Sequence, residues 1–167
     1  LYFFNKKITG VNPKTFKVIG SNKLIIKDDK GVYYLGREEV KKIQNADLNT
    51  FEEVSKEYYR DKNNVFYYDN YDGDVVKGAD AKTFEAIEGY ALGRDKNAVY
   101  DRGKMIKGLD PVTFEDLNGD FYKDKNGVYY EGMLMKGIDS KSFELFVNYT
   151  HVKDKNGIYS FYQKENE

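Results

Sequence analysis

The chain has no cysteine and no tryptophan, and it contains one histidine and two prolines. Without cysteine, disulfides, thiolate zinc sites and cysteine nucleophiles are excluded, and the redox compartment stays open. No apolar run approaches the roughly 20 residues that a membrane-spanning helix needs. The 27 basic and 28 acidic residues leave a net charge of -1, so there is no overall field toward nucleic acid or an anionic membrane. We therefore expect no transmembrane segment and no nucleic-acid partner.

Catalytic motifs are equally scarce. His151 is the only histidine, so a catalytic triad would have to be built around it, and we expect an ordinary strand residue instead. A nucleophile elbow, a phosphate-binding loop and a dinucleotide fingerprint are all absent. Carboxylates are plentiful, which leaves a glycosidase-like pair as an alternative, but the repeated aspartates lie in turns, where capping of backbone amides explains them. The sequence predicts a protein without enzymatic activity and without a cofactor.

What the chain does have is 16 tyrosines, 11 phenylalanines and a tandem repeat of about thirty residues. One phrase is an Asp, a few polar residues, a branched apolar residue and then one or two aromatic residues. It occurs at 28–34, 61–67, 95–100, 124–130 and 154–159. A second phrase places Asp or Asn three to four residues ahead of a Thr/Ser-Phe pair, at 12–16, 47–51, 80–84, 110–114 and 139–143. Aromatic and β-branched residues in this pattern are typical of strands.

The repeat predicts an all-β fold. We expect two antiparallel strands in each repeat, for example 128–135 and 143–149, with the chain reversing about every fifteen residues. A meander or a solenoid-like array is favoured over a propeller, because a four-stranded blade takes about 40 residues. Residues 1–167 are expected to form a single repeat-array domain. It begins in mid-repeat, since residues 1–3 match 128–130, and we expect an upstream half-repeat or cap.

Both phrases contain turn residues. In Asp-Lys-Asn-Gly at 124–127, the pattern predicts a hairpin tip with the glycine in a left-handed conformation. Asn64 tolerates the same geometry, whereas Ala98 at the equivalent position predicts a strained turn. The Asp-Pro-Val-Thr-Phe segment at 110–114 predicts the opposite tip, with its Phe pointing inward.

Two consecutive repeats carry insertions. The interval from the apolar anchor to the Phe is fifteen residues in three repeats, but nineteen from Val32 to Phe51 and from Val65 to Phe84. Insertions in repeat proteins collect on one face, which is often the binding face, so we expect these two to lie side by side. The first, at 37–42, is typical of a helical turn, and the second, at 69–74, of a polar loop. The candidate binding residues are therefore Glu38, Glu39, Asp69, Tyr71, Asp72 and Asp74.

The three aspartates of the second insertion surround a glycine, so they could also supply oxygen ligands to Ca²⁺. Their spacing differs from that of an EF-hand loop, and a solvated loop is the favoured interpretation. No metal site is predicted.

The phrases at 124–130 and 61–68 resemble the DKNYY family of bacterial repeat proteins, and the resemblance runs across essentially all 167 residues. It implies an exported or envelope-associated protein, while the compartment itself stays unknown. It carries no activity, ligand or site residue. Two repeats depart from the pattern: residues 28–31 lack the Asn, and Tyr100 is followed by Asp101 in place of a second aromatic residue.

We expect a non-catalytic repeat module that acts as a protein-interaction or structural component. The alternative is a glycan-binding module that uses exposed tyrosines, because in Val-Tyr-Tyr the two tyrosines occupy opposite faces of a strand. A hydrolase with paired carboxylates is third. The partner is an unknown protein or glycan.

Overall fold

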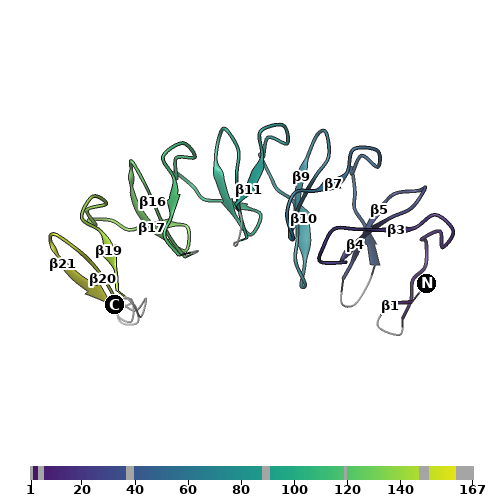
Figure 1. Ribbon diagram of the computed structural model, residues 1–167, viewed down its shortest axis with the longest axis horizontal. Helices are drawn as coiled ribbons and strands as arrows, with labels where there is room; N and C mark the ends of the chain where they lie inside the picture. The colour runs from purple at the N-terminus through teal and green to yellow at the C-terminus, as the bar shows by residue number, and fades with distance from the viewer. Residues whose placement is uncertain are drawn as a thin grey trace. The chain divides into compact units, whose positions relative to one another are not determined.

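The computed structural model describes residues 2–3, 6–36, 40–87, 91–118, 120–146 and 151–160. Every regular element in these residues is a β-strand, and all strands pair antiparallel with their neighbours in the sequence. The predicted all-β repeat fold is confirmed (Figure 1). The chain divides into two compact units, Leu1–Met105 and Ile106–Glu167, which are described separately. The prediction of one array domain over 1–167 therefore stays a prediction.

The first unit contains a two-stranded sheet and three four-stranded sheets. Their strands are β1 (Tyr2–Phe3) and β2 (Lys6–Lys7); β3 (Lys17–Ile19), β4 (Ile25–Lys27), β5 (Val32–Leu35) and β6 (Val40–Lys42); β7 (Glu52–Glu53), β8 (Tyr58–Arg60), β9 (Val65–Tyr68) and β10 (Gly73–Val75); β11 (Glu85–Ile87), β12 (Leu92–Arg94), β13 (Val99–Asp101) and β14 (Lys104–Met105). The two strands of the first sheet, β1 and β2, pair in the register Tyr2–Lys7 and Phe3–Lys6.

The second unit contains a four-stranded sheet and a three-stranded sheet. Their strands are β15 (Glu115–Asp116), β16 (Phe121–Asp124), β17 (Gly127–Tyr130) and β18 (Met133–Leu134); β19 (Glu144–Leu145), β20 (His151–Asp154) and β21 (Gly157–Ser160). His151 lies in a strand, as expected.

Each full repeat builds four short strands, where the sequence predicted two longer ones. The predicted strand at 128–135 is divided into β17 and β18 by a turn at Glu131 and Gly132, whose φ angles are 47° and 77°. Of the predicted strand at 143–149, Glu144–Leu145 forms β19, while 147–149 lie outside the described residues. Strands of two to four residues let a four-stranded sheet fit into about thirty residues, so the length argument against a propeller blade does not hold.

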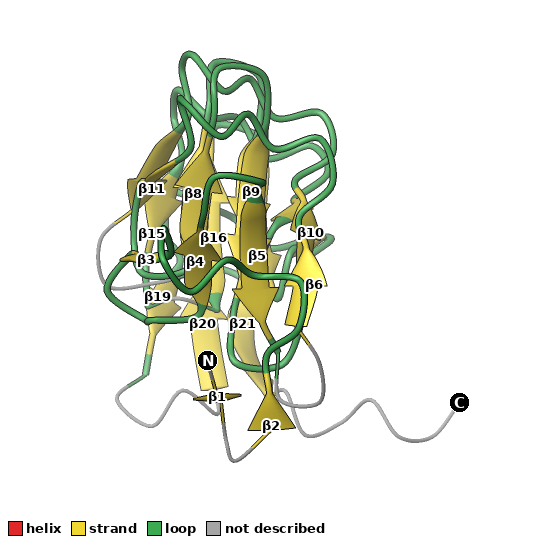
Figure 2. Cartoon of the chain, turned by 90° about the vertical axis from the view of Figure 1, so that its right-hand side faces the viewer, coloured by secondary structure: helices red, strands yellow, loops and turns green. Residues whose placement is uncertain are grey.

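The two turn phrases lie at the same end of each repeat, which corrects the prediction of opposite tips. The backbone N–H of Asp110, in the second phrase, donates to Asp124 Oδ2 in the first phrase at 2.6 Å. The cause is the extra reversal between them, because a chain that turns about every seven residues returns to the same end after fifteen. In Figure 2 the loops drawn above β8 and β9 lie at this end of the strands.

An aspartate at the start of the first phrase joins the two turns. In the second four-stranded sheet, Asp61 Oδ1 accepts the N–H groups of Asn63 and Asn64, each at 2.7 Å, and Oδ2 accepts the N–H of Asp47 at 2.7 Å. The five equivalent residues, which we call the hub aspartates, are 3–8% exposed: Asp28, Asp61, Asp95, Asp124 and Asp154. A buried carboxylate with three backbone donors is well satisfied, so the predicted capping role of these residues is confirmed.

The second-phrase aspartate extends this network. Asp47 Oδ1 accepts both the N–H and the hydroxyl of Thr50, and its other oxygen lies 2.6 Å from Lys62 Nζ. The Thr50 hydroxyl oxygen in turn accepts the N–H of Lys62. The same contacts recur around Asp80, Asp110 and Asp139. The Asp and Lys of the repeated phrase are thus used to fasten two turns together.

Gly127 has a positive φ of 158°, as the sequence predicted for this turn, but the equivalent residues of the other repeats do not share it. Gly31 and Gly157 do not have positive φ, and Ala98 fits the same hydrogen bonds as its counterparts, with its N–H 2.9 Å from Asp95 Oδ1. Because the hub carboxylate holds this turn, the position needs no left-handed residue, and Ala98 is unstrained. Left-handed residues instead occur two positions before the second-phrase Asp or Asn, at Gly10, Asn45, Gly78, Gly108 and Gly137.

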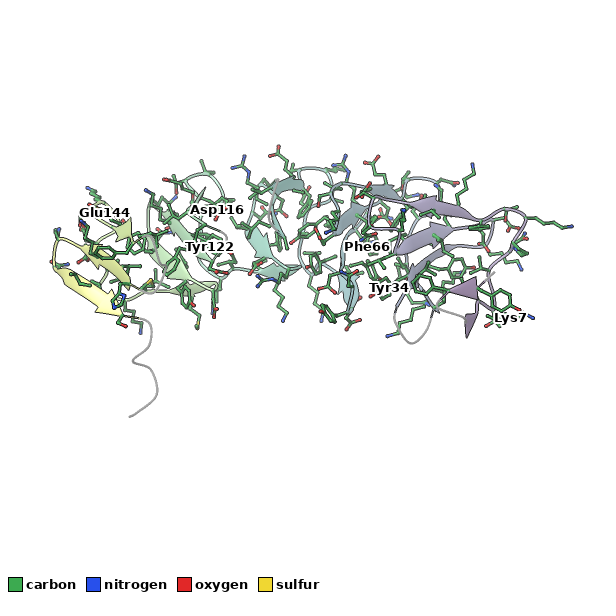
Figure 3. The ribbon with its side chains drawn as sticks, turned by 60° about the horizontal axis from the view of Figure 1, so that its bottom comes forward. Lys7, Tyr34, Phe66, Asp116, Tyr122 and Glu144 are labelled. Carbon is green, nitrogen blue, oxygen red and sulfur yellow. The ribbon has the colours of Figure 1, made fainter. Side chains whose placement is uncertain are left out.

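Within each unit the core lies between successive sheets, and the second four-stranded sheet contributes both of its faces. Toward the preceding sheet, β8 and β9 present Tyr59 and Phe66, which pack with Val32 and Tyr34 of β5. Toward the following sheet they present Tyr58, Val65 and Tyr67, which pack with Phe84 and Tyr100. Figure 3 shows Tyr34 and Phe66 pointing into the layer between these first two four-stranded sheets. The predicted inward position holds for Phe51 and Phe84, whereas Phe16 is 37% exposed.

Candidate functional site

Both insertions lie in the hairpin between the third and fourth strands of their sheets. In the second one, residues 69–72 extend the β9–β10 hairpin, and Asp69 caps its own turn by accepting the N–H groups of Tyr71 and Asp72 at 2.8 and 2.9 Å. In the first one, Val40–Lys42 form β6, so the predicted helical turn is wrong there. Residues 37–39, which include the candidates Glu38 and Glu39, lie outside the described residues.

The β9–β10 hairpin packs against the preceding repeat. The Tyr34 hydroxyl donates to the Asp69 carbonyl at 2.9 Å, and the Tyr34 and Tyr68 rings lie 4.8 Å apart. Between these two sheets, the Tyr68 ring therefore packs over Tyr34. The second insertion is therefore held on the side of β5, although its position relative to residues 37–39 is not described.

At the next joint the hairpins change length, and a groove results. The β13–β14 hairpin is shorter than β9–β10, and its turn consists of Arg102 and Gly103, with φ angles of 45° and 72°. Between the first two four-stranded sheets, the Tyr68 ring packs against Tyr34. In the next sheet, the position of Tyr68 is taken by Arg102, so among the described residues no aromatic ring packs against Tyr67 in the same way. Gly103 packs closely there, because a Cβ at that residue would lie 2.7 Å from the Tyr67 Cβ.

The groove has a volume of about 680 Å³, and we call it the hairpin groove. One wall belongs to the β9–β10 hairpin and the other to the β13–β14 hairpin. Its lining residues are Tyr67, Asp69, Asp72, Gly73, Asp74, Val75, Lys77, Arg102, Gly103, Lys104 and Met105. Tyr67 and Met105 supply its apolar side chains, and the Met105 side chain is 51% exposed, whereas the Val75 side chain packs on the opposite face of the sheet, toward the preceding repeat.

Acidic and basic side chains lie in different parts of the hairpin groove. Asp69, Asp72 and Asp74 belong to the β9–β10 hairpin, while Lys77 follows β10 and Lys104 lies in β14. Within the described part of the chain, neither Asp72, Asp74, Lys77 nor Lys104 forms an ion pair. Charges without an internal partner are available to a ligand of opposite charge.

Tyr67 is the ionisable phenol of the groove. Its ring lies edge-on to Tyr58, with centroids 5.1 Å apart, and burial together with the nearby Asp69 carboxylate raises the Tyr67 pKa to about 12. At neutral pH the hydroxyl is therefore protonated, so it can form hydrogen bonds but cannot act as a base.

β10 offers the groove an open backbone edge. It is the outermost strand of its sheet and pairs with β9 in the register Gly73–Tyr68, Asp74–Tyr67 and Val75–Phe66. The bonds from Val76 N–H to Val65 O and from Asp69 N–H to Asp72 O fix which residues face β9. Because antiparallel strands alternate their bonding direction, the backbone groups of Gly73 and Val75 point away from β9. The Val75 N–H is bonded to Asp74 Oδ1 at 2.7 Å.

The predicted site residues are thus partly brought together. Asp69, Asp72 and Asp74 line the hairpin groove, whereas Tyr71 is 75% exposed and does not line it. In the described residues, no group of three acidic or histidine side chains could hold a metal ion. Sequence reasoning missed Lys77, Arg102, Gly103, Lys104 and Met105. The available signal was the change in anchor interval from nineteen to fifteen residues, which marks where a long hairpin meets a short one.

Comparison with known proteins places the chain in one family. The family model described as the DKNYY family matches residues 1–70 and 104–165, which is well over half of the chain. Residues 71–103, which supply seven of the groove's lining residues, lie outside the matched ranges. No curated protein and no solved structure matches the chain. In the described residues, no helix is long and apolar enough to cross a membrane. Each repeat has a pair of turns fastened by Asp and Lys, followed by aromatic strands. The chain with these repeats belongs to the DKNYY family.

Proposed function

We propose that the chain is a non-catalytic module that binds a protein partner. The observation that supports this proposal is the hairpin groove, where an open strand edge, an apolar floor and unpaired charges of both signs meet. These are the features that bind an extended polypeptide: backbone groups give affinity, and pockets for alternate side chains give specificity.

Hydrolysis by paired carboxylates has little support from the described residues. The recurring pair is a hub aspartate with the second-phrase aspartate whose N–H it accepts, such as Asp61 with Asp47. Both carboxylates are already engaged, Asp61 by three backbone amides and Asp47 by Thr50 and Lys62. A general acid or base needs a carboxyl that is free to exchange a proton with substrate.

Glycan binding by a row of tyrosines has less support than peptide binding. Among the described tyrosines, those of the repeated phrase are buried or half-buried, and only Tyr2 and Tyr71 are strongly exposed, at 73% and 75%. A sugar-stacking surface needs exposed aromatic faces in a common row.

A parallel screen tests the proposed function. The chain is immobilised and presented to a random-peptide display library and to a glycan array, and it is assayed with esterase, phosphatase and glycosidase substrates. We expect enriched peptides, no bound glycan and no turnover. Glycan binding without peptides, turnover that one Asp or Glu substitution abolishes, or no binding at all would each overturn the proposal.

A bacterial envelope or exported location is part of this proposal and is supported by the family resemblance alone. Protease treatment of intact cells that express the complete gene product tests it. We expect cleavage without lysis, and protection until lysis would contradict it.

A further inference from the structure

We propose that the hairpin groove binds an extended polypeptide segment that pairs with the outer edge of β10 and carries a basic and an acidic side chain about five residues apart. This inference rests on the proposed function and specifies its site, its binding mode and the charge pattern of the partner. No metal ion or covalent step is involved.

The edge of β10 determines the binding mode. Gly73 and Val75 direct their N–H and C=O groups away from β9, and three consecutive residues of this strand line the groove. A segment that pairs with them adds a fifth strand to the sheet β7–β10. The Val75 N–H would exchange its bond to Asp74 Oδ1 for one to the ligand backbone, which releases the Asp74 carboxylate.

The charges along this edge determine the partner's pattern. Asp72 and Asp74 lie at the hairpin end of β10, and Lys77 follows its other end, five positions after Asp72. Paired strands match residue for residue, so complementary charges on the ligand have a similar separation. A segment with only basic residues would meet Lys77 and Lys104, and one with only acidic residues would meet Asp72 and Asp74. The groove therefore discriminates against both.

The interior of the groove selects alternate apolar residues. The pairing of Asp74 with Tyr67 places both side chains on the face toward the third four-stranded sheet, and Met105, paired with Tyr100, faces back toward them. A ligand strand directs every second side chain into this space. Apolar side chains such as valine would contact Tyr67 and Met105 there.

The probe that tests the proposal is the fluorescein-labelled, amide-capped peptide Lys-Thr-Val-Thr-Val-Glu, titrated against the chain by fluorescence anisotropy. When this peptide lies parallel to β10, its Lys is opposite Asp72 and its Glu is opposite Lys77. Two control peptides are matched to it. One replaces both valines by proline and so cannot pair as a strand, and the other replaces the lysine by glutamate. We expect each control peptide to bind at least tenfold more weakly, and the Gly73 and Val75 amides to gain protection from hydrogen exchange when the probe binds.

Two protein variants test the two parts of the site. The double variant Asp72→Asn with Asp74→Asn removes the acidic end, and Val75→Pro blocks the outward N–H of β10 while leaving the bonds to β9. Leu134→Pro in β18 is the matched control, because Leu134 occupies the equivalent place in its own hairpin. We expect at least tenfold weaker probe binding for the first two and unchanged binding for the control. Thermal melting of each variant checks the fold.

The proposal is overturned if the wild-type chain does not bind the probe at millimolar concentration, if the proline peptide binds as well as the probe, or if Leu134→Pro weakens binding as much as Val75→Pro. Peptides selected by display whose binding is unaffected by all three variants would overturn this site and leave the proposed function standing. A display screen that selects no peptide would remove both.

Discussion

The aspartate that opens the first phrase is the residue on which each repeat depends. Asp61 accepts three backbone hydrogen bonds from two separate turns, and its side chain is 3% exposed. Sequence reasoning identified the capping of the nearer turn, because Asp ahead of Asn and Gly is a common turn signal. It did not identify the bond to Asp47, since a contact between turns fourteen residues apart depends on the extra reversal between them.

We therefore expect Asp61→Ala to destabilise the chain by about 3 kcal/mol, because three buried or half-buried amides lose a charged acceptor. Urea unfolding monitored by circular dichroism measures the change. Asp72→Ala is the control, because the Asp72 side chain is exposed and accepts no bond in the described residues, and it should alter the free energy of unfolding by less than about 0.5 kcal/mol. Equal effects of the two substitutions would show that the hub contacts do not hold the repeat.

The second-phrase aspartates make stability depend on acid pH. The Lys125 ammonium beside Asp110 and the Lys155 ammonium beside Asp139 lower the pKa of each carboxyl from 3.8 to about 2. A carboxyl whose pKa is depressed in the folded state contributes stability above its unfolded pKa and loses it as pH falls toward the folded pKa. The thermal midpoint should therefore be level above about pH 5 and fall between about pH 4 and pH 2.

The matched variant is Lys125→Met, which should show a shallower fall in thermal midpoint over the same range, because the Asp110 pKa returns toward its ordinary value. The comparison is made at low salt, since exposed ion pairs are screened. A pH profile identical to that of the wild type would contradict the assignment of Lys125 as the cause.

The sequence predicted the strands better than it predicted the turns. The aromatic strands and the Asp turns were recognisable from composition and spacing. The reversals at Arg102–Gly103 and Glu131–Gly132 were missed because each places only one glycine inside an apolar stretch that is long enough to read as a single strand. A positive φ was predicted at each of the turns that follow a hub aspartate but is absent from Gly31, Ala98 and Gly157, because the hub carboxylate already stabilises the turn.

Two glycines of the last repeat test the corrected assignment. Neither Gly137 nor Gly157 has any atom within 4 Å of where a Cβ would lie, but Gly137 has a φ of 84° and Gly157 does not have positive φ. Gly137→Ala should destabilise the chain by about 1 kcal/mol through backbone strain, and Gly157→Ala should be neutral or stabilising. Thermal melts compare them directly, and a reversed order would restore the left-handed turn at the hub aspartate.

The hairpin groove is a property of neighbouring repeats and belongs to neither alone. The insertions and the aspartates of 69–74 were visible in the sequence. The groove was not, because it depends on a shorter hairpin in the next sheet, whose turn has Arg102 where β9 continues with Tyr68. A change of interval becomes a cavity only when successive sheets stack face to face.

Lengthening the short hairpin should therefore close the groove. Inserting Asp-Asn-Tyr-Asp before Gly103 gives β13–β14 the length of β9–β10, and Arg102→Tyr in the same variant supplies the counterpart of Tyr68, which can pack against Tyr67 as Tyr68 packs against Tyr34. We expect probe binding to be abolished without loss of fold, as measured by anisotropy and thermal melting. The same insertion before Gly132, in the β17–β18 hairpin, should leave binding unchanged, and a lengthened β13–β14 hairpin that still binds would place the site elsewhere.

The paired turns also bear on how such a chain can evolve. Among the described residues, each hub aspartate bonds to residues of its own repeat, at most sixteen positions away, whereas the aromatic faces are shared with the neighbouring sheet. Gene duplication or deletion of one repeat would thus carry a complete set of polar contacts with it and disturb only a hydrophobic surface, which tolerates substitution of similar volume. Chains of this kind can change length by whole repeats, and a binding groove can arise wherever a long hairpin and a short one become neighbours.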